Sequence, residues 1–153
     1  MKAVVQRVQS AAVLVSGERV GEIDQGLMVL LAVERGDGPE QVAKMVHKLS
    51  GLRIFSDDRG RMDRSVRDIG GAVLAVSQFT LAATLAKGFR PSFDGAEAPE
   101  SALLLFELFC RQLTATGVPV ATGRFGADMQ VHLVNDGPVT FILEYPPTRS
   151  RES

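Results

Sequence analysis

Two hydroxyl side chains and an amide stand directly after an apolar run, in the segment Ser77-Gln78-Phe79-Thr80. Residues 72–76, which precede the segment, have the composition of a strand that is buried on both faces. Polar groups at the end of such a strand need partners, and backbone N–H groups there can bind a ligand. The segment is therefore a candidate site, although a strand end with a local serine or threonine hydrogen bond explains its composition as well.

A second candidate is the segment Asn135-Asp136-Gly137-Pro138-Val139-Thr140. Its first three residues are typical of a β-hairpin turn, so one interpretation is that the segment only joins two strands. Pro138 complicates that interpretation, because it lacks an N–H and would weaken hydrogen bonding where the next strand begins. A cis bond between Gly137 and Pro138 would turn two carbonyl groups to one side as a rigid pair of acceptors. The sequence alone leaves both interpretations open.

The usual catalytic sets are not evident. Ser77, His132 and Asp136 could form a nominal triad, but no nucleophile-elbow motif surrounds the serine. His132 alternates with apolar residues on a predicted strand, so we expect it to face solvent, and we expect the same of His47 on a predicted helix. Cys110 lies on a stripe of leucine and phenylalanine and is expected to be a buried thiol. With two histidines and one cysteine, we expect no structural metal site.

Basic and aromatic residues interleave in residues 87–93, which read Lys87-Gly88-Phe89-Arg90-Pro91-Ser92-Phe93. Such a loop could hold a phosphate or stack a base, and it could equally be an ordinary turn. Charges of both signs alternate in residues 57–64, which favours a solvated loop over an RNA-binding patch.

Two helices and about nine strand-like segments would have to position these residues. One helix is expected to begin at Pro39, and a second to begin near Pro99 and stop at Gly117. The clearest strands are residues 2–9, 11–15, 20–23, 27–33, 72–76, 129–133 and 139–144. The pattern predicts an α+β fold with a mainly antiparallel, curled or barrel-like β-sheet and two principal helices packed outside. We expect one domain, residues 1–145, and a flexible C-terminal tail, residues 146–153.

Composition narrows the class of protein further. A chain of 153 residues that is 45% hydrophobic and 23% charged is typical of a soluble globular protein. The absence of a signal-peptide core, of a long apolar stretch and of a second cysteine predicts a cytoplasmic protein with no membrane association. The formal net charge of −1 argues against a protein that coats nucleic acid, but not against an enzyme that grips one end of an RNA.

Taken in order, these segments resemble the D-aminoacyl-tRNA deacylase (D-tyrosyl-tRNA deacylase) family. The resemblance runs from Ala3 to about Glu144. Its motifs are residues 3–8, 26–31, 52–55, 77–81, 90–93, 123–129 and 135–140. Each motif is weak by itself, but the order and spacing of the set are specific. The chain departs from the family pattern in the apolar run 82–86 and at Phe89, where a polar or basic residue is usual.

The resemblance implies a cytosolic homodimer that needs no metal and no cofactor, with the active site at the dimer interface. Ser77, Gln78, Phe79 and Thr80 of one subunit would form the floor of the pocket. A cis Gly137–Pro138 pair from the other subunit would hold the substrate α-amino group and reject L-amino acids. Arg7 would brace that dipeptide, and Met129 would line the pocket for the terminal adenosine of the tRNA.

The function implied is hydrolysis of the ester of D-aminoacyl-tRNA, and of glycyl-tRNA, because side-chain exclusion cannot reject glycine. An aminoacyl ester is already activated, so oriented water and backbone N–H groups around Phe79 and Thr80 would suffice. A neighbouring ribose hydroxyl of the tRNA is expected to assist the water, while Ser77 and Thr80 position the substrate. Two alternatives remain: an RNA-binding module without hydrolysis, and a small-molecule esterase with Thr80 or Ser77 as nucleophile.

Overall fold

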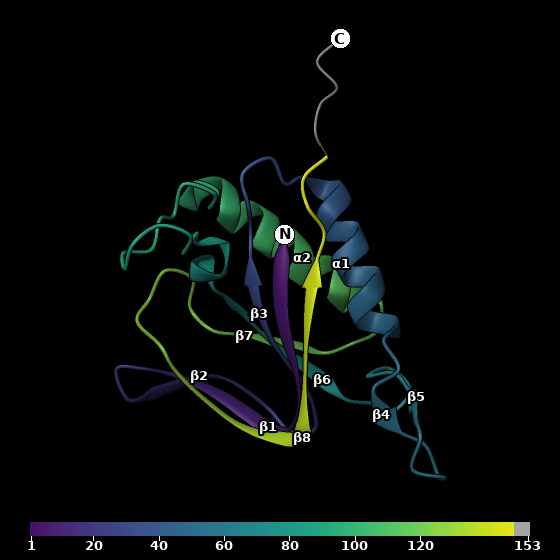
Figure 1. The fold of residues 1–153 in the computed structure, drawn as a ribbon. Helices are drawn as coiled ribbons and strands as arrows, with labels where there is room; N and C mark the ends of the chain where they lie inside the picture. Colours follow the sequence, from purple (N-terminus) through teal and green to yellow (C-terminus); the bar gives the residue numbers. More distant parts are fainter. Residues whose placement is uncertain (149–153) are drawn as a thin grey trace.

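Eight strands and two long helices make up residues 1–148, the part of the chain that the computed structural model describes (Figure 1). The strands are β1 (Lys2–Val15), β2 (Glu18–Ile23), β3 (Gly26–Ala32), β4 (Phe55–Ser56), β5 (Met62–Arg64), β6 (Ala72–Ser77), β7 (Val120–Thr122) and β8 (Gln130–Glu144). The helices are α1 (Pro39–Gly51) and α2 (Pro99–Ala115), with a short 3-10 segment, η1 (Phe79–Ala82), after β6.

The main sheet is mixed. Its strand order is β2-β1-β3-β6-β7, and β8 pairs with the free side of β1. The strand β1 is antiparallel to β2, β3 and β8, whereas the pairs β3–β6 and β6–β7 are parallel. Parallel neighbours need a crossover, which α1 provides between β3 and β6, and α2 between β6 and β7. The predicted α+β fold with a curled sheet is confirmed, with a parallel centre beside the antiparallel pairs.

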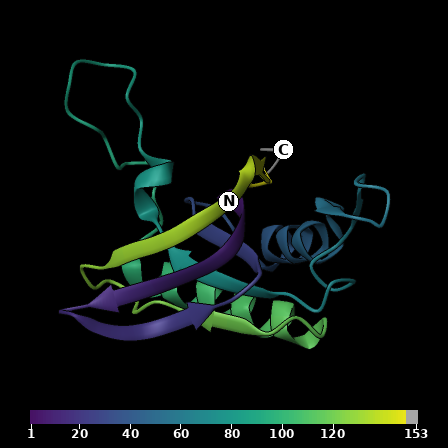
Figure 2. The ribbon, with the colours of Figure 1, turned by 90° about the horizontal axis from the view of Figure 1, so that it is seen from below.

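The sheet curls until its two ends nearly meet (Figures 1 and 2). A Cβ atom at Gly21 of β2 would collide with the backbone carbonyl of Thr122 in β7. Glycine at this position therefore lets the two terminal strands approach. Inside the curl, buried apolar side chains form one core; it comprises Val8, Ala11, Val13, Ile23, Met28, Leu74 and Val76.

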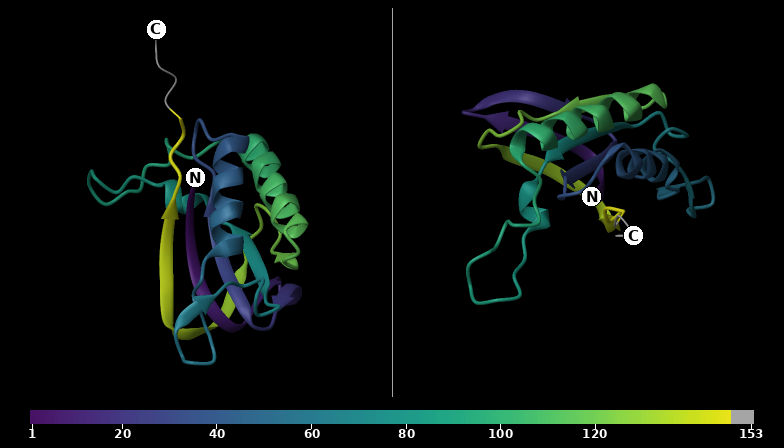
Figure 3. Two further views of the ribbon diagram at one scale, coloured as in Figure 1. Left: turned by 90° about the vertical axis from the view of Figure 1, so that its right-hand side faces the viewer. Right: turned by 90° about the horizontal axis from the view of Figure 1, so that it is seen from above.

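Both helices lie side by side on the outer face of the sheet (Figure 3). Helix α1 begins at Pro39, and the Gln41 side chain accepts a 2.8 Å hydrogen bond from the Gly38 N–H at its start. Helix α2 begins at Pro99, as predicted. Their apolar faces and the strands beneath them enclose the larger core, which includes Leu27, Leu31, Val42, Met45, Leu49, Phe106, Phe109 and Leu113.

Two strand predictions were wrong. Residues 2–15 form a single strand, because β1 runs on across Ser10 while changing partner from β3 to β2. The predicted strands 129–133 and 139–144 are likewise parts of one strand, β8, so the hairpin interpretation of residues 135–140 is wrong. Both halves of β8 pair with β1 and not with each other, since Gln6 faces Thr140 and Val8 faces Asn135. Residues 136–139 therefore bulge from one long strand.

The two ends of the described chain are tied to helix α1 and to the turn before it. The α-amino group of Met1 is buried and hydrogen-bonds with Glu34 and Asp37, each at 2.9 Å. Of the expected flexible tail, Thr148 contacts Glu40 at 2.9 Å, and residues 149–153 lie outside the described part of the chain. None of the helices in residues 1–148 combines the length and apolar character needed to span a membrane.

Candidate active site

A cavity of about 640 Å³ lies where β6 ends, beside η1 and the start of α2. Four of the predicted site residues line it, namely Ser77, Gln78, Phe79 and Met129. The other residues of its lining are Val33, Arg35, Val76, Phe93, Ala96, Glu97, Ala98, Pro99, Ala102, Phe125, Gly126, Ala127, Asp128 and Val131. Its size is that of a small-molecule site, and its walls combine aromatic, aliphatic and charged groups.

Residues 77–79 form one wall of the cavity because β6 ends at Ser77, whereas Thr80, the last residue of the predicted segment, is not part of the lining. The Gln78 N–H donates a 2.8 Å hydrogen bond to Leu31 in the neighbouring strand, and the chain then turns into η1. The side-chain amide of Gln78 donates to the Thr80 hydroxyl oxygen at 2.6 Å. The Thr80 hydroxyl, one residue beyond the lining, is thus held by an amide, which cannot act as a base.

Phe79 and Met129 supply the apolar part of the lining. Phe79 is more than half exposed and meets Phe93 edge-on, with the two ring centroids 5.1 Å apart. Met129 reaches the cavity from the segment before β8, and a Cβ at Gly123 would lie 2.6 Å from its sulfur. Gly123 therefore makes room for the Met129 side chain.

Three charged residues of the cavity were not found from the sequence. Arg35, Glu97 and Asp128 all line it, although they come from three separate loops. Arg35 donates from its backbone N–H to Gly95 and from its side chain to Ala96, which joins the loop after β3 to the chain before α2. No local pattern marks them, because the cavity forms only when these loops meet in the fold.

The second predicted segment lies at the bulge of β8, where the Gly137–Pro138 peptide bond is cis. The Arg7 guanidinium donates to the Asp136 carbonyl at 2.9 Å and to the Ile54 carbonyl at 2.7 Å. The side-chain amide of Asn135 donates to the carbonyls of Arg7 and Val139, at 2.9 and 3.0 Å. Asn135 therefore clamps both ends of the bulge, a role that its hairpin-like sequence concealed.

Within one chain the two predicted segments are far apart. Figure 1 shows η1 beside the upper end of β3, whereas β8 turns its corner at the opposite end of the sheet. Arg7, Gly137 and Pro138 are not part of the cavity lining. The predicted residues therefore form two groups. Four line the cavity and Thr80 follows them in η1, whereas Arg7, Gly137 and Pro138 lie at the bulge.

The rejected catalytic set is also dispersed. Ser77 lines the cavity, His132 is exposed in a different surface hollow, and Asp136 pairs with Arg7 at 3.5 Å. The Cys110 thiol is half-buried on α2 and not fully buried as the sequence predicted, and burial raises its pKa to about 11, with a smaller contribution from the charge of Glu107. Residues 1–148 contain no cluster of three or more histidine, cysteine or acidic side chains that could hold a metal ion.

Comparison with known proteins identifies the group to which this arrangement belongs. Residues 4–144 match the family model described as D-Tyr-tRNA(Tyr) deacylase. The chain belongs to this family. A D-aminoacyl-tRNA deacylase of Geobacter metallireducens is 57% identical over 146 residues, which are 95% of this chain and 97% of that protein. The D-aminoacyl-tRNA deacylase of Geobacter sulfurreducens is 56% identical over 153 residues, with coverage of 100% and 99%.

Solved structures show the same deacylase-family fold. A structure titled "c-Myc DNA Unwinding Element Binding Protein" is 44% identical, with a TM-score of 0.91, and the match covers 95% of this chain and 99% of that one. A structure described as a probable eukaryotic D-amino acid tRNA deacylase is 20% identical, with a TM-score of 0.80 and coverage of 93% and 97%. The second likeness concerns the fold alone.

Proposed function

We propose that the protein hydrolyses the ester that joins a D-amino acid to the terminal ribose of tRNA, and that the cavity beside Ser77 receives the aminoacyl-adenosine end. The observation that carries the proposal is the gathering of Ser77, Gln78, Phe79 and Met129 around one cavity of about 640 Å³ in a chain of this family. The names of relatives that are 56–57% identical support it. A cytoplasmic location follows from a tRNA substrate.

In the proposed reaction, water attacks the ester carbonyl carbon and forms the new carbon–oxygen bond. The bond from that carbon to the ribose oxygen then breaks, and a proton from the water passes to the ribose oxygen that leaves. The neighbouring ribose hydroxyl orients the water. The N–H groups of Phe79 and Thr80, at the start of η1, stabilise the charge that develops on the carbonyl oxygen.

Thr80 acts in this scheme by positioning the substrate. Its hydroxyl oxygen accepts a hydrogen bond from the Gln78 amide, which cannot remove the hydroxyl proton. A nucleophilic threonine would need a base bonded to its hydroxyl, and within residues 1–148 the side-chain hydrogen-bond partner of Thr80 is the Gln78 amide. The hydroxyls of Thr80 and Ser77 hold the ester against the water instead.

Selection for the D-form is assigned to Gly137 and Pro138 of a second copy of the chain. Their carbonyl groups would hold the substrate α-amino group, so that the side chain of an L-amino acid runs into the dipeptide. Glycine has no side chain to exclude, so glycyl-tRNA would also be cleaved. The bulge that carries the dipeptide is held in place by Arg7 and Asn135.

The exposed strand β8 supports an arrangement of two copies. Among the described residues, β1 is its only strand partner, so one edge of β8 remains unpaired. Large apolar side chains are also exposed along it, namely Val131, Val134, Phe141 and Ile142. A long edge strand with apolar side chains is a surface suited to a second chain.

The first test compares two substrates. Purified protein should deacylate D-Tyr-tRNA rapidly and leave L-Tyr-tRNA intact, and equal rates on the two would overturn the proposal. The binding-only alternative, which the DNA-binding name of the 44% identical structure also suggests, requires bound and uncleaved D-Tyr-tRNA. The small-molecule esterase requires an acyl-enzyme trapped on Thr80 or Ser77.

A second test addresses the composite site. Thr80→Ala and Pro138→Ala variants should each be inactive alone, while a refolded 1:1 mixture should recover about a quarter of the wild-type activity. That fraction is expected because half of randomly formed dimers would be mixed, and each mixed dimer would contain one site with both motifs intact. A mixture as inactive as its components would exclude a site shared between two copies.

A further inference from the structure

A long surface loop leaves the protein beside the cavity. Every residue from 84 to 95 is exposed, and the loop projects from the body of the protein in Figures 2 and 3. Two backbone hydrogen bonds between Thr84 and Ser92, of 2.8 and 3.0 Å, close its neck. At its base, Phe93 packs against Phe79 and lines the cavity. The loop is thus anchored to the cavity wall.

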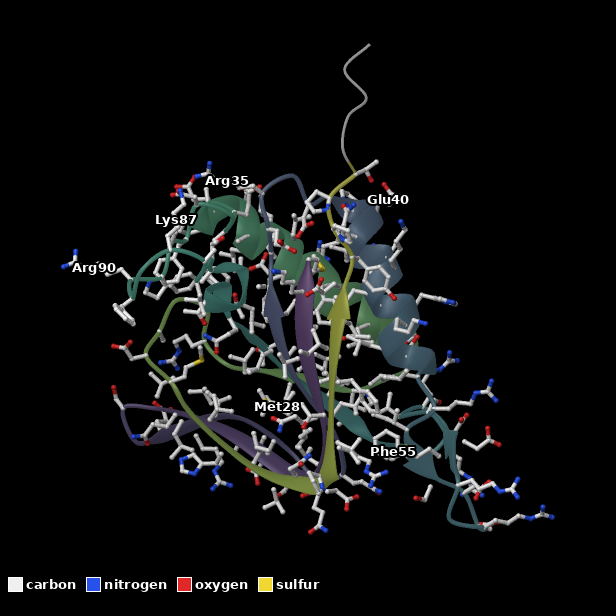
Figure 4. All side chains as sticks on the ribbon, in the orientation of Figure 1. Met28, Arg35, Glu40, Phe55, Lys87 and Arg90 are labelled. Atoms are coloured by element: carbon white, nitrogen blue, oxygen red, sulfur yellow. The ribbon has the colours of Figure 1, made fainter. Side chains whose placement is uncertain are left out.

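The tip of this loop carries two cations and two large apolar side chains. Lys87 and Arg90 are exposed, and neither forms an ion pair with a carboxylate of residues 1–148. Phe89 is as accessible as an isolated phenylalanine, and Leu85 is 71% exposed. Figure 4 shows Lys87 and Arg90 on the side of η1, away from Glu40 on α1.

None of these four side chains contributes to either core of the protein. Exposed apolar groups beside free cations indicate a surface that binds something, and the binding partner must offer negative charge and flat apolar faces. Single-stranded RNA has both, because its phosphates attract lysine and arginine while its unpaired bases stack on aromatic rings. Arg35 adds a third cation at the base of the loop, where its backbone N–H donates to Gly95.

We propose that residues 85–91 form an RNA-binding loop that holds the single-stranded acceptor end of the tRNA outside the cavity. Lys87 and Arg90 contact phosphates, and Phe89 stacks on an unpaired base. The inference rests on the proposed function for the identity of the RNA. The loop provides affinity for the nucleic acid and takes no part in ester cleavage or in the choice of the D-form.

The test compares a Lys87→Ala/Arg90→Ala double variant and a Phe89→Ala variant with two controls on the helices. Lys48→Ala removes an exposed cation from α1, and Leu104→Ala removes an exposed apolar side chain from α2. Each protein is assayed on D-tyrosyl-tRNA and on D-tyrosyl-adenosine, which lacks the rest of the RNA. Binding of uncharged tRNA is measured over a range of salt concentrations.

Both loop variants should raise KM for D-tyrosyl-tRNA and weaken the binding of uncharged tRNA by about tenfold. The double variant should also lower the salt dependence of binding by roughly 1.5 in the slope of log K against log salt, as loss of two phosphate contacts requires. Rates on D-tyrosyl-adenosine, the preference for the D-form and both controls should stay at wild-type values.

Unchanged tRNA binding in the loop variants would overturn the proposal. If the loop variants lost as much activity on D-tyrosyl-adenosine as on D-tyrosyl-tRNA, the proposal would also be overturned, because the loop would then belong to the site of cleavage. If the loop variants differ from wild-type protein in the molar mass measured by sedimentation, the loop is a contact between copies of the chain, and the proposal is overturned. If wild-type protein cleaves neither substrate, the proposed function fails, and the binding of uncharged tRNA still decides whether the loop contacts RNA.

Discussion

Arg7 donates a 2.9 Å hydrogen bond to the backbone carbonyl of Asp136 and lies 3.5 Å from the carboxylate of the same residue. The guanidinium is mostly buried, and it also donates to the Ile54 carbonyl at 2.7 Å. One side chain of β1 therefore joins the bulge of β8 to the segment before β4. Gly137 directly follows Asp136, so this contact lies next to the cis Gly137–Pro138 bond.

Replacing Arg7 with alanine should destabilise the protein by about 3 kcal/mol, because two carbonyls lose a charged donor in a mostly buried place. Deacylation should fall with it, since the bulge loses its brace. Arg7→Lys should recover little, because one ammonium cannot reach both carbonyls in the same geometry. Urea unfolding and the rate of D-Tyr-tRNA cleavage measure the two effects.

The control for this prediction is Arg53→Ala. Arg53 pairs with Asp63 at 3.2 Å, but both side chains are more than half exposed. The variant should therefore lose less than about 1 kcal/mol of the free energy of unfolding. If Arg7→Ala were no more harmful than Arg53→Ala, the bracing role of Arg7 would be wrong.

Changing Asn135 to aspartate should be more harmful than changing it to alanine. Alanine only removes the hydrogen bonds of the amide, which should lower the free energy of unfolding by about 2 kcal/mol. Aspartate would place a carboxylate against the carbonyls of Arg7 and Val139, which now accept from the amide. Thermal unfolding of the two variants tests the order, with Gln130→Asp as a control that adds the same charge to an exposed position of β8.

Cys110 should react slowly with thiol reagents in the folded protein. Burial raises its pKa from 9.0 to about 11, so at pH 8 only about one thiol in a thousand is ionised, against about one in ten after unfolding. Because the folded pKa is raised, the half-buried thiol favours folding below pH 9 and loses that contribution as the pH rises towards 11.

Reaction rates with a coloured disulfide reagent, measured at pH 8 with and without denaturant, check the expected protection. Cys110→Ala gives the background. Equal rates in the folded and unfolded protein would contradict the raised pKa of the thiol. Loss of deacylation in Cys110→Ala would give the thiol a role that the cavity does not predict.

The acid sensitivity of the protein should depend in part on Asp68. A hydrogen bond from the Ser65 N–H, 2.8 Å long, is the main reason that the pKa of Asp68 lies below its ordinary value of 3.8. The carboxylate therefore stabilises the fold above pH 3.8 and loses this contribution as the pH falls through the lowered pKa. Asp68→Asn should lower the melting temperature at pH 7 and have a smaller effect at the acid end.

Melting curves from pH 7 down to pH 2 test this sign, with the exposed Asp24→Asn as the control. If Asp68→Asn lowered the melting temperature equally at every pH, the charge of the Asp68 carboxylate would not be what stabilises the turn.

Local signals in the sequence were sufficient for the helices and the central strands. Proline at 39 and at 99, followed by apolar residues at helical spacing, predicted the starts of α1 and α2 correctly. The hydroxyl segment after β6 was found because polar residues are unusual at the end of a buried strand. These features depend on neighbours in the chain, so the sequence contains them directly.

Features that depend on distant residues could not be predicted. The hairpin interpretation of residues 135–140 failed because the register of β8 is set by β1, more than a hundred residues away. The charged lining of the cavity, Arg35, Glu97 and Asp128, escaped notice for the same reason. The bracing role of Arg7 came only from family resemblance, and the sequence pattern gives no local sign of it.

The position of β1 also determines how the protein should lose its structure. This strand hydrogen-bonds with β2, β3 and β8 and carries Arg7 near its middle. Its amides can exchange with deuterium only when the whole sheet opens, because no single partner can release it. The bulge that it holds should therefore keep its shape until global unfolding, while the 84–95 loop exchanges within the native state.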